Sequence, residues 1–365
     1  MDFMKLMEDW NGYAAIKEAA RGEGYDQRLN ATIDLLTNAA GHPVHRHEYL
    51  LREALTTSDF PIMFGDVLDR QVLAAYKAVD PVWKAFVKES TVKDFKTAYR
   101  FAIADGDQYL AEVNEKGEYL ASQRTESKYD LSVKKYGRQF DISWETLIND
   151  DLGALKDTPT RFARAAVRTE HRIVTALYAR NAVTYTGAHG NMVAGALTIA
   201  NLETGLEAMA AFTDDNGEPI MNRAKYLVVP PALEMTALAI LNSTTMMRAD
   251  AGAPAPYPTT NVVAKAGLTL VIDPYLPVID ATDGATGWYL FADPNDIAAL
   301  EVAWLRGHER PEICMKASDK VTVGGGSINP MSGDFETDNV LYRVREVFGG
   351  VALDYRATYM GGSTL

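Results

Sequence analysis

The stretch KYGRQFDISWETLINDDLGAL (135–155) changes from a strand pattern to a helix pattern, and this change indicates how the chain is built. Just before it, Leu131 and Val133 are apolar at odd positions, whereas Tyr136 and Phe140 are apolar at even positions. Because successive side chains of a strand point to opposite faces, the apolar face changes side between Val133 and Tyr136. The sequence therefore predicts a strand with a local irregularity, and the adjacent Gly137 favours a β-bulge.

The second half of the stretch predicts a short helical segment and then a long helix. Ser143 can cap the segment WETLIND, which ends before Gly153. Thr158 and Pro159 are residue types preferred at the cap and first position of a helix, and the helical pattern continues to about Arg180. At about 1.5 Å per residue, the helix over 159–180 would be roughly 33 Å long.

Two faces of this predicted helix differ in character. The apolar face comprises Phe162, Ala166, Ile173 and Leu177. The basic face comprises Arg161, Arg164, Arg168 and Arg172. Neighbouring guanidinium groups repel one another, so anions are expected opposite them. Carboxylates elsewhere in this chain are one interpretation, and a neighbouring subunit or nucleic acid is the other.

Upstream of the helix, residues 92–143 have a different composition from the rest of the chain. They are rich in Tyr, Phe, Val, Thr and charged residues and contain no proline. Strand patterns at 92–103 and 127–143 flank a turn signal at Asn114-Glu115-Lys116-Gly117. The segment is too polar for a core sheet, so we expect a long β-excursion that another surface covers.

Beyond residue 190 the pattern is that of an α/β region. Helix patterns cover 201–213 and 232–243, and an apolar run at 224–231 predicts a buried strand that two prolines end. LTLVIDPYLP and GWYLFAD predict two further strands. The alternating stretch DNVLYRVREVFGGVALDYRATYMG predicts a hairpin that turns near Gly349-Gly350.

Composition limits the classes of protein to consider. A chain of 365 residues allows two or three domains at roughly 100–200 residues each. A net charge of −13 disfavours a sequence-independent nucleic-acid binder and suits a protein that stays soluble at high local concentration. The single cysteine, Cys314, excludes an intramolecular disulfide and a CxxC zinc site. The start MDFMKLMEDW has no signal-peptide pattern, and no apolar run reaches membrane-span length, so we expect a soluble cytoplasmic protein.

Two polar clusters invite a chemical interpretation. HPVHRHE places His42, His45, His47 and Glu48 close together, but the segment lies between helical fragments without a second ligand cluster. Asp150 and Asp151 could bind a cation with Asp157, yet neighbouring side chains on a helix point about 100° apart. A solvated turn and helix-terminal acids are the preferred interpretations of the two clusters.

The remaining candidate motifs are weaker. VGGGSINP (323–330) resembles a phosphate loop but lacks the GxxxxGK(S/T) spacing. Cys314 is interpreted as a small buried hydrophobe. We therefore predict no catalytic, cofactor-binding or metal-binding residues and no enzymatic activity.

The order of these parts resembles a known family. EALTTSDFPIMFGDVLDRQVLAAY (53–76), the β-excursion ending in KYGRQFDISWETLINDDLGAL, and the helix TPTRFARAAVRTEHRIVTALY together resemble a major capsid protein of tailed bacteriophages. The resemblance is closest to the major head subunits of Mu-like prophages. It covers about 50–185 most strongly and implies an α+β chain with the Hong Kong 97-type fold.

The resemblance also implies a division of the chain. An N-terminal arm would cover 1–58, and an extended loop over an adjacent subunit would cover 92–143. A peripheral domain would comprise 59–91 and 144–190, with 159–180 as its spine helix. An axial domain would cover 191–335, and strands 336–365 would return to the peripheral domain.

Several residues take a role through this resemblance. The extended loop offers Asn114, Glu115, Lys116, Gly117 and Tyr119 as candidates for contact with a neighbouring subunit. Lys135, Gly137 and Ser143 would form the hinge where the loop re-enters the peripheral domain. Some family members crosslink a loop lysine to a neighbour's asparagine, but no acid catalyst surrounds Lys116, so we predict no crosslink.

The implied function is that of a virion shell subunit. Copies would form pentamers and hexamers that enclose double-stranded DNA without sequence-specific binding, after assembly in the cytoplasm of a bacterial host. Portal, scaffold, maturation protease and decoration proteins are further candidate partners, and no membrane or cofactor is expected. An encapsulin-like bacterial nanocompartment is the alternative with the same fold. A metal-dependent hydrolase that uses the histidine cluster is a distant third.

Overall fold

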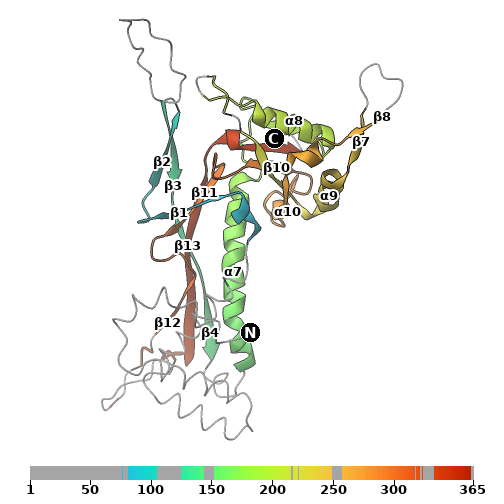
Figure 1. Cartoon of the computed structure of the whole chain (residues 1–365). Helices are drawn as coiled ribbons and strands as arrows, with labels where there is room; N and C mark the ends of the chain where they lie inside the picture. Colours follow the sequence, from blue (N-terminus) through green and yellow to red (C-terminus); the bar gives the residue numbers. More distant parts are fainter. Residues whose placement is uncertain are drawn as a thin grey trace, which may run out of the picture. The chain divides into compact units, whose positions relative to one another are not determined.

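The computed structural model of the chain describes residues 76, 81–104, 125–143, 152–214, 217–220, 222–248, 257–316, 318–320, 323 and 333–362 (Figure 1). The chain divides into two compact units. The first unit comprises 1–79, 135–166 and 310–346, and the second comprises 80–134, 167–309 and 347–365. The boundary falls within helix α7 (Leu152–Tyr178) and strand β13 (Asn339–Ala352).

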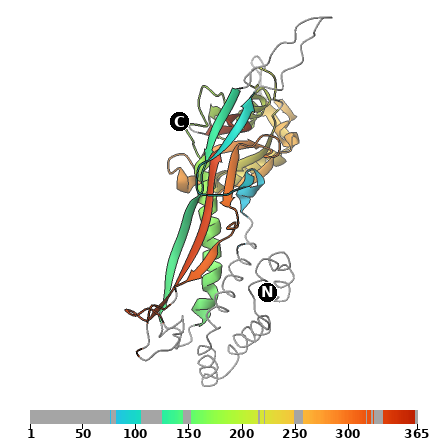
Figure 2. The same cartoon turned by 90° about the vertical axis from the view of Figure 1, so that its left-hand side faces the viewer.

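The first unit contains paired strands and the beginning of α7. Strand β12 (Glu312–Met315) pairs antiparallel with β13, from Glu312 opposite Arg345 to Met315 opposite Tyr342. Strand β4 (Lys134–Ser143) also pairs with β13, beside which it runs in Figure 2. The Phe140 ring stacks on Phe162 and on Tyr342, with ring centroids 4.7 and 5.1 Å apart. Aromatic stacking thus joins β4, α7 and β13 within this unit.

The second unit contains a mixed sheet with helices. Among the described residues this sheet has the order β5-β14-β10-β6-β9. Its strands are β5 (Met192–Ala194), β14 (Thr358–Gly362), β10 (Trp288–Ala292), β6 (Ala224–Val229) and β9 (Thr269–Ile272). The α-helices associated with it are α8 (Ile199–Ala210), α9 (Glu234–Asn242) and α10 (Leu276–Ile279). Every residue of β10 is buried, as expected for a central strand.

Further strands of the second unit pair outside this sheet. Strand β1 (Lys88–Val92) pairs in parallel with β11 (Leu300–Leu305), which pairs antiparallel with the end of β13. Strands β2 (Ala98–Ala104) and β3 (Thr125–Leu131) form an antiparallel pair, as do β7 (Thr245–Arg248) and β8 (Tyr257–Thr260). The 3-10 helices are η3 (Val82–Ala85), η4 (Pro231–Leu233), η5 (Val263–Ala266) and η6 (Tyr355–Ala357).

Two clusters of buried side chains stabilise the second unit. Trp83 of η3 is fully buried and packs against Trp304 and Phe348, with ring centroids 6.2 and 6.0 Å away. The second cluster comprises Val92, Leu131, Val133, Ala303, Leu305 and Val347. The apolar residues just before the opening stretch therefore belong to a core.

The change of apolar face between Val133 and Tyr136 has a different cause from the predicted bulge. Strand β3 ends at Leu131 and β4 begins at Lys134, with two residues between them outside either strand. Strand β3 pairs with β2, whereas β4 pairs with β13. The chain leaves one sheet and enters another at this point, which accounts for the change of face, and a bulge next to Gly137 stays a prediction.

Two other predictions need correction. Helix α7 begins at Leu152 and ends at Tyr178, so Thr158 and Pro159 lie inside it. The preceding residues LGALKD include good helix formers, and one proline costs the helix a hydrogen bond without ending it here. Of the predicted apolar face only Ala166 is buried, while Phe162, Ile173 and Leu177 are partly buried.

The predicted C-terminal hairpin is also wrong, because β13 runs unbroken through Gly349 and Gly350. A Cβ added at Gly349 would lie 2.2 Å from the carbonyl oxygen of Ser132, and one at Gly350 would lie 2.7 Å from Leu177 Cδ1. These glycines allow close packing and do not form a turn.

The strands and helices predicted in the α/β region are confirmed as β6, β9, β10, α8 and α9. The predicted α+β class is likewise confirmed. No helix in the described part of the chain is long and apolar enough to cross a membrane.

Candidate interaction surfaces

Part of the predicted site lies outside the described residues. This holds for the loop candidates Asn114, Glu115, Lys116, Gly117 and Tyr119, for the cluster His42, His45, His47 and Glu48, and for Asp150 and Asp151. Among the residues that are described, no group of three His, Cys, Asp or Glu side chains could hold a metal ion. Cys314 lies in β12 and is half-buried.

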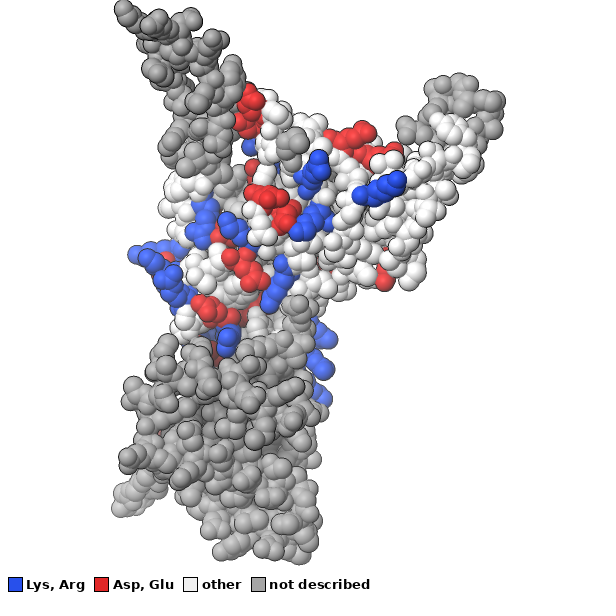
Figure 3. All heavy atoms as spheres, in the orientation of Figure 1, with Lys and Arg blue, Asp and Glu red and all other residues white. Residues whose placement is uncertain are grey.

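The basic residues of α7 form an exposed row, which we call the arginine row. Its members are Arg161, Arg164, Arg168 and Arg172, and all four are exposed. At 3.6 residues per turn their directions fall within about 80° of one another around the helix axis. Lys and Arg side chains are visible along α7 in Figure 3. Within the described part of the chain, no carboxylate forms an ion pair with any of the four.

The predicted hinge residues all lie on β4. Lys135 and Gly137 are exposed, and Ser143 is the last residue of the strand. A Cβ at Gly137 would lie 2.5 Å from the carbonyl oxygen of Val344 on β13. Gly137 therefore allows two strands to approach closely, whereas the hinge role of the three residues stays a prediction.

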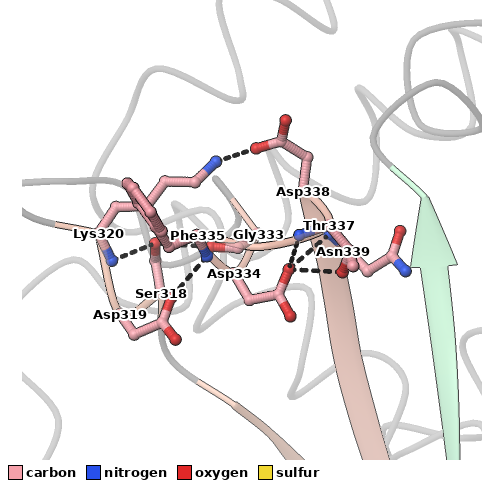
Figure 4. A network of polar contacts seen from close by, with 9 residues as sticks. All are labelled: Ser318, Asp319, Lys320, Gly333, Asp334, Phe335, Thr337, Asp338 and Asn339. Atoms are coloured by element: carbon pink, nitrogen blue, oxygen red, sulfur yellow. Dashed lines mark hydrogen bonds and ion pairs between the residues drawn. The ribbon is translucent and has the colours of Figure 1, made fainter.

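A hydrogen-bonded turn in the first unit was not predicted from the sequence. It comprises 318–320 and 333–339, and we call it the Phe335 turn (Figure 4). The Asp334 carboxylate accepts hydrogen bonds from the Thr337 hydroxyl at 2.7 Å, the Thr337 backbone N–H at 3.0 Å and the Asn339 backbone N–H at 3.3 Å. These bonds hold the pKa of Asp334 below its ordinary value, those from Thr337 most strongly.

Two side chains connect the separate segments of the Phe335 turn. Asp319 accepts a hydrogen bond from the Phe335 backbone N–H at 2.8 Å, and Lys320 forms an ion pair with Asp338. The Phe335 side chain is nevertheless 78% exposed. The turn thus holds the backbone of an aromatic residue whose ring the described residues leave open to solvent.

A second exposed surface lies on strands β2 and β3. Tyr99 and Phe101 are exposed, and Lys128 Nζ lies 3.5 Å from the centre of the Tyr99 ring. Arg100, between them on the strand, points to the other face and donates a hydrogen bond to Glu301 at 2.7 Å. One face of this strand pair therefore contacts the rest of the second unit, and the other exposes aromatic side chains.

A group of buried polar side chains in the second unit is centred on Asp273, which is 1% exposed and follows β9. Thr175 and Tyr178 of α7 both donate hydrogen bonds to Asp273 Oδ2, that from Thr175 at 2.6 Å. His171 Nε2 lies 3.0 Å from Asp273 Oδ1. Burial alone would raise the pKa of Asp273, but His171, Thr175 and Tyr178 together outweigh it and lower that pKa.

These contacts indicate a structural rather than a chemical role for the Asp273 group. Asp273 and His171 are both buried, so a substrate would have no access to the carboxylate. The group attaches α7 to the end of β9. Sequence periodicity did not predict this group, because Thr175 and His171 are polar residues on the buried face of the helix. The one indication in the sequence is an acid, Asp273, directly after an apolar strand.

A model of a protein family described as "Phage capsid protein" matches residues 127–361, which is more than half of the chain. The chain therefore belongs to the phage capsid protein family. No curated protein sequence matches it.

Solved structures to which this chain is similar include chains from phages. One from Gordonia phage Cozz has a TM-score of 0.48 at 15% identity and covers 78% of this chain and 87% of that chain. One titled "Capsid structure of the Cyanophage P-SCSP1u" has a TM-score of 0.49 at 12% identity. The match covers 78% of this chain and 88% of that chain. A virus-like particle protein from Pyrococcus furiosus has a TM-score of 0.41 at 10% identity, with 81% and 98% covered.

Family membership confirms the predicted kinship with tailed-phage capsid proteins. The protein is a major capsid shell protein with a mixed α+β structure, and its place is the capsid of a virion. Such shells are built from surfaces rather than from active sites, so the exposed features described above are the candidate functional sites.

Proposed function

We propose that copies of this chain form pentamers and hexamers that close into an icosahedral head around double-stranded phage DNA. The observation that carries this proposal is the match of the phage capsid family over residues 127–361. Exposed aromatic side chains on β2–β3 and the arginine row support it, because both are surfaces that a neighbouring copy would cover.

Within such a head, the segment 92–143 acts as the extended loop over an adjacent copy. The remaining parts are the arm 1–58, the peripheral domain 59–91 and 144–190, the axial domain 191–335 and the returning strands 336–365. The β2–β3 pair supports the loop assignment, because these strands pair only with each other among the described strands. Lys135, Gly137 and Ser143 form the hinge at the base of this loop.

The wall of the head encloses DNA and does not grip it. A net charge of −13 opposes strong contact with phosphates, so packaged DNA can slide along the wall. The role is structural and requires no catalytic step by this chain. Assembly takes place in the bacterial cytoplasm, with a portal, scaffold, maturation protease or decoration protein as further partners.

Electron microscopy of the purified chain tests the proposal. We expect closed particles with pentameric and hexameric units in negative stain, and DNA inside particles recovered from phage-producing cells. A chain that stays monomeric under all assembly conditions would contradict the proposal. Particles that contain a protein cargo and no DNA would instead indicate a nanocompartment shell.

A further inference from the structure

Among the described residues, the arginine row has no anionic partner. It extends over about 17 Å of α7, at 1.5 Å per residue, and all four of its members are exposed. Glu170, on the same helix, is buried and accepts a hydrogen bond from Trp304 Nε1 at 3.2 Å. Like charges three and four residues apart on a helix destabilise it, so a counter-charge from another molecule would be favourable.

The Phe335 turn has the complementary properties. Its aromatic side chain is 78% exposed and lies between two acids, Asp334 and Glu336. Glu336 is exposed and has no ion pair with any described residue. Since hydrogen bonds to Asp334 and Asp319 already hold the backbone, little conformational entropy would be lost when the ring is covered.

We propose that the Phe335 turn of one copy docks on the arginine row of a second copy. A guanidinium group would lie over the Phe335 ring, and the Glu336 carboxylate would pair with an adjacent arginine. This inference rests on the proposed self-assembly and adds to it a particular pair of contacting surfaces. The exposed Phe95 and Phe101 fit the row less well, because Phe95 is followed by Lys96, and Phe101 lies opposite Lys128.

The exposed aromatic ring favours a second copy over DNA as the occupant of the row. Each neighbouring copy brings a net charge of −13 and an aromatic ring to cover, whereas the DNA backbone offers phosphates only. Arginine binds both a carboxylate and an aromatic face, and the Phe335 turn presents both side by side.

Charge reversal tests the proposal in the full-length chain. We expect Glu336→Arg to reduce the yield of sedimenting particles about tenfold, which corresponds to ~1.4 kcal/mol of contact free energy. Four compensating substitutions, each combined in turn with Glu336→Arg, are Arg161→Glu, Arg164→Glu, Arg168→Glu and Arg172→Glu. At least one of them, combined with Glu336→Arg, should restore the yield of the unmodified chain, as measured by gradient sedimentation and negative stain. Arg223→Glu, at an exposed arginine away from α7, is the matched control and should not restore it.

Four outcomes would overturn the inference. They are a normal particle yield for Glu336→Arg, a lack of restoration by all four compensating substitutions, restoration by Arg223→Glu, and arginine-row variants that form normal shells but lose DNA. The last result would assign the row to phosphates. If the unmodified chain forms no particles, the proposed function itself fails, so the two failures are distinguishable.

A second measurement covers the case in which a reversed variant does not fold. In a Cys314→Ser background, copies with Glu336→Cys are assembled with copies that carry a cysteine in the arginine row. Oxidation should yield a covalent dimer for at least one row position and none for Arg223→Cys. Absence of the dimer from assembled shells at all four positions would also overturn the inference.

Discussion

Asp273 accepts hydrogen bonds from two side chains of helix α7, Thr175 and Tyr178, and lies 3.0 Å from a third, His171. We expect Asp273→Asn to lower the free energy of unfolding by about 3 kcal/mol, because it removes the charge that Thr175, Tyr178 and His171 surround. Urea unfolding of the unassembled chain at neutral pH measures this. Asp296→Asn, at an exposed aspartate, is the control and should change stability little.

The same carboxylate makes stability depend on pH. The pKa of Asp273 is lower in the folded chain than in the unfolded chain, so its contribution is fully present above the unfolded pKa of about 3.9. The contribution is lost as the pH falls through the lower, folded pKa. The stability difference between the unmodified chain and Asp273→Asn should therefore be constant from neutral pH to about pH 5 and narrow below about pH 4. A difference that widens in acid would contradict this assignment.

Individual residues were the hardest part of the structure to predict. The positions of Arg161, Arg164, Arg168 and Arg172 followed from helical spacing alone, and their exposure agrees with it. Glu336 and Phe335 gave no signal, because their environment depends on hydrogen bonds between segments separated in sequence. The group around Asp273 was missed because Thr175 and His171 are polar residues on the buried face of α7.

Gly137 allows strand β4 to approach β13 closely, because it has no side chain. Gly137→Ala would place a Cβ 2.5 Å from the Val344 carbonyl oxygen, and we expect a loss of about 1–3 kcal/mol of stability. Gly187→Ala is the matched control, because nothing lies within 4 Å of an added Cβ there. That control should be neutral or slightly stabilising in thermal unfolding. Equal effects of both substitutions would contradict the close approach.

Helix α8 begins with a side-chain cap. The Thr198 hydroxyl accepts a hydrogen bond from the Asn201 backbone N–H at 3.2 Å. Thr198→Ala should lower the free energy of unfolding by about 1 kcal/mol. Thr198→Ser keeps a hydroxyl that can cap the helix, so it should lose only a small part of that stability. Chemical denaturation of both variants measures the difference, and a Ser variant as unstable as the Ala variant would argue against the cap.

Whole elements were predicted well where local pattern determines them. Strands β6, β9 and β10 and helices α8 and α9 followed from apolar runs and helical periodicity. The hairpin predicted at Gly349 and Gly350 was wrong, because glycine is favoured both in turns and where two segments pack closely. Only the contacts with Ser132 and Leu177 show that close packing is the reason here. Sequence alone does not reveal such distant neighbours.

The charge of the whole chain leads to a prediction about DNA. With a net charge of −13, the purified chain should bind double-stranded DNA more weakly than about 10⁻⁴ M at physiological salt. Fluorescence anisotropy with a labelled duplex measures this. Replacement of the four arginines of the row by alanine should leave the result unchanged, whereas salt-sensitive micromolar binding that these changes abolish would contradict it.

The family and fold class could be recognised from the order of the parts, since a β-excursion before a long helix is visible in the sequence. The pairing partner of each strand could not be recognised from the sequence. Strand β1 pairs with β11 about two hundred residues later, and nothing in KESTV specifies that partner. Parallel pairing between strands so far apart in the sequence depends on the tertiary packing of the segments between them.

The place of β14 in its sheet also sets the time at which a copy becomes competent to join others. This strand lies between β5 and β10, and Met360 is the register partner of Met192. At about 5–20 residues per second, the ribosome reaches Met360 roughly 10 to 30 s after Met192. During that interval β5 and β10 lack the strand that joins them, so nascent chains on one messenger RNA cannot yet present finished surfaces to each other. Any surface that depends on this sheet is therefore complete only after β14 has been synthesised.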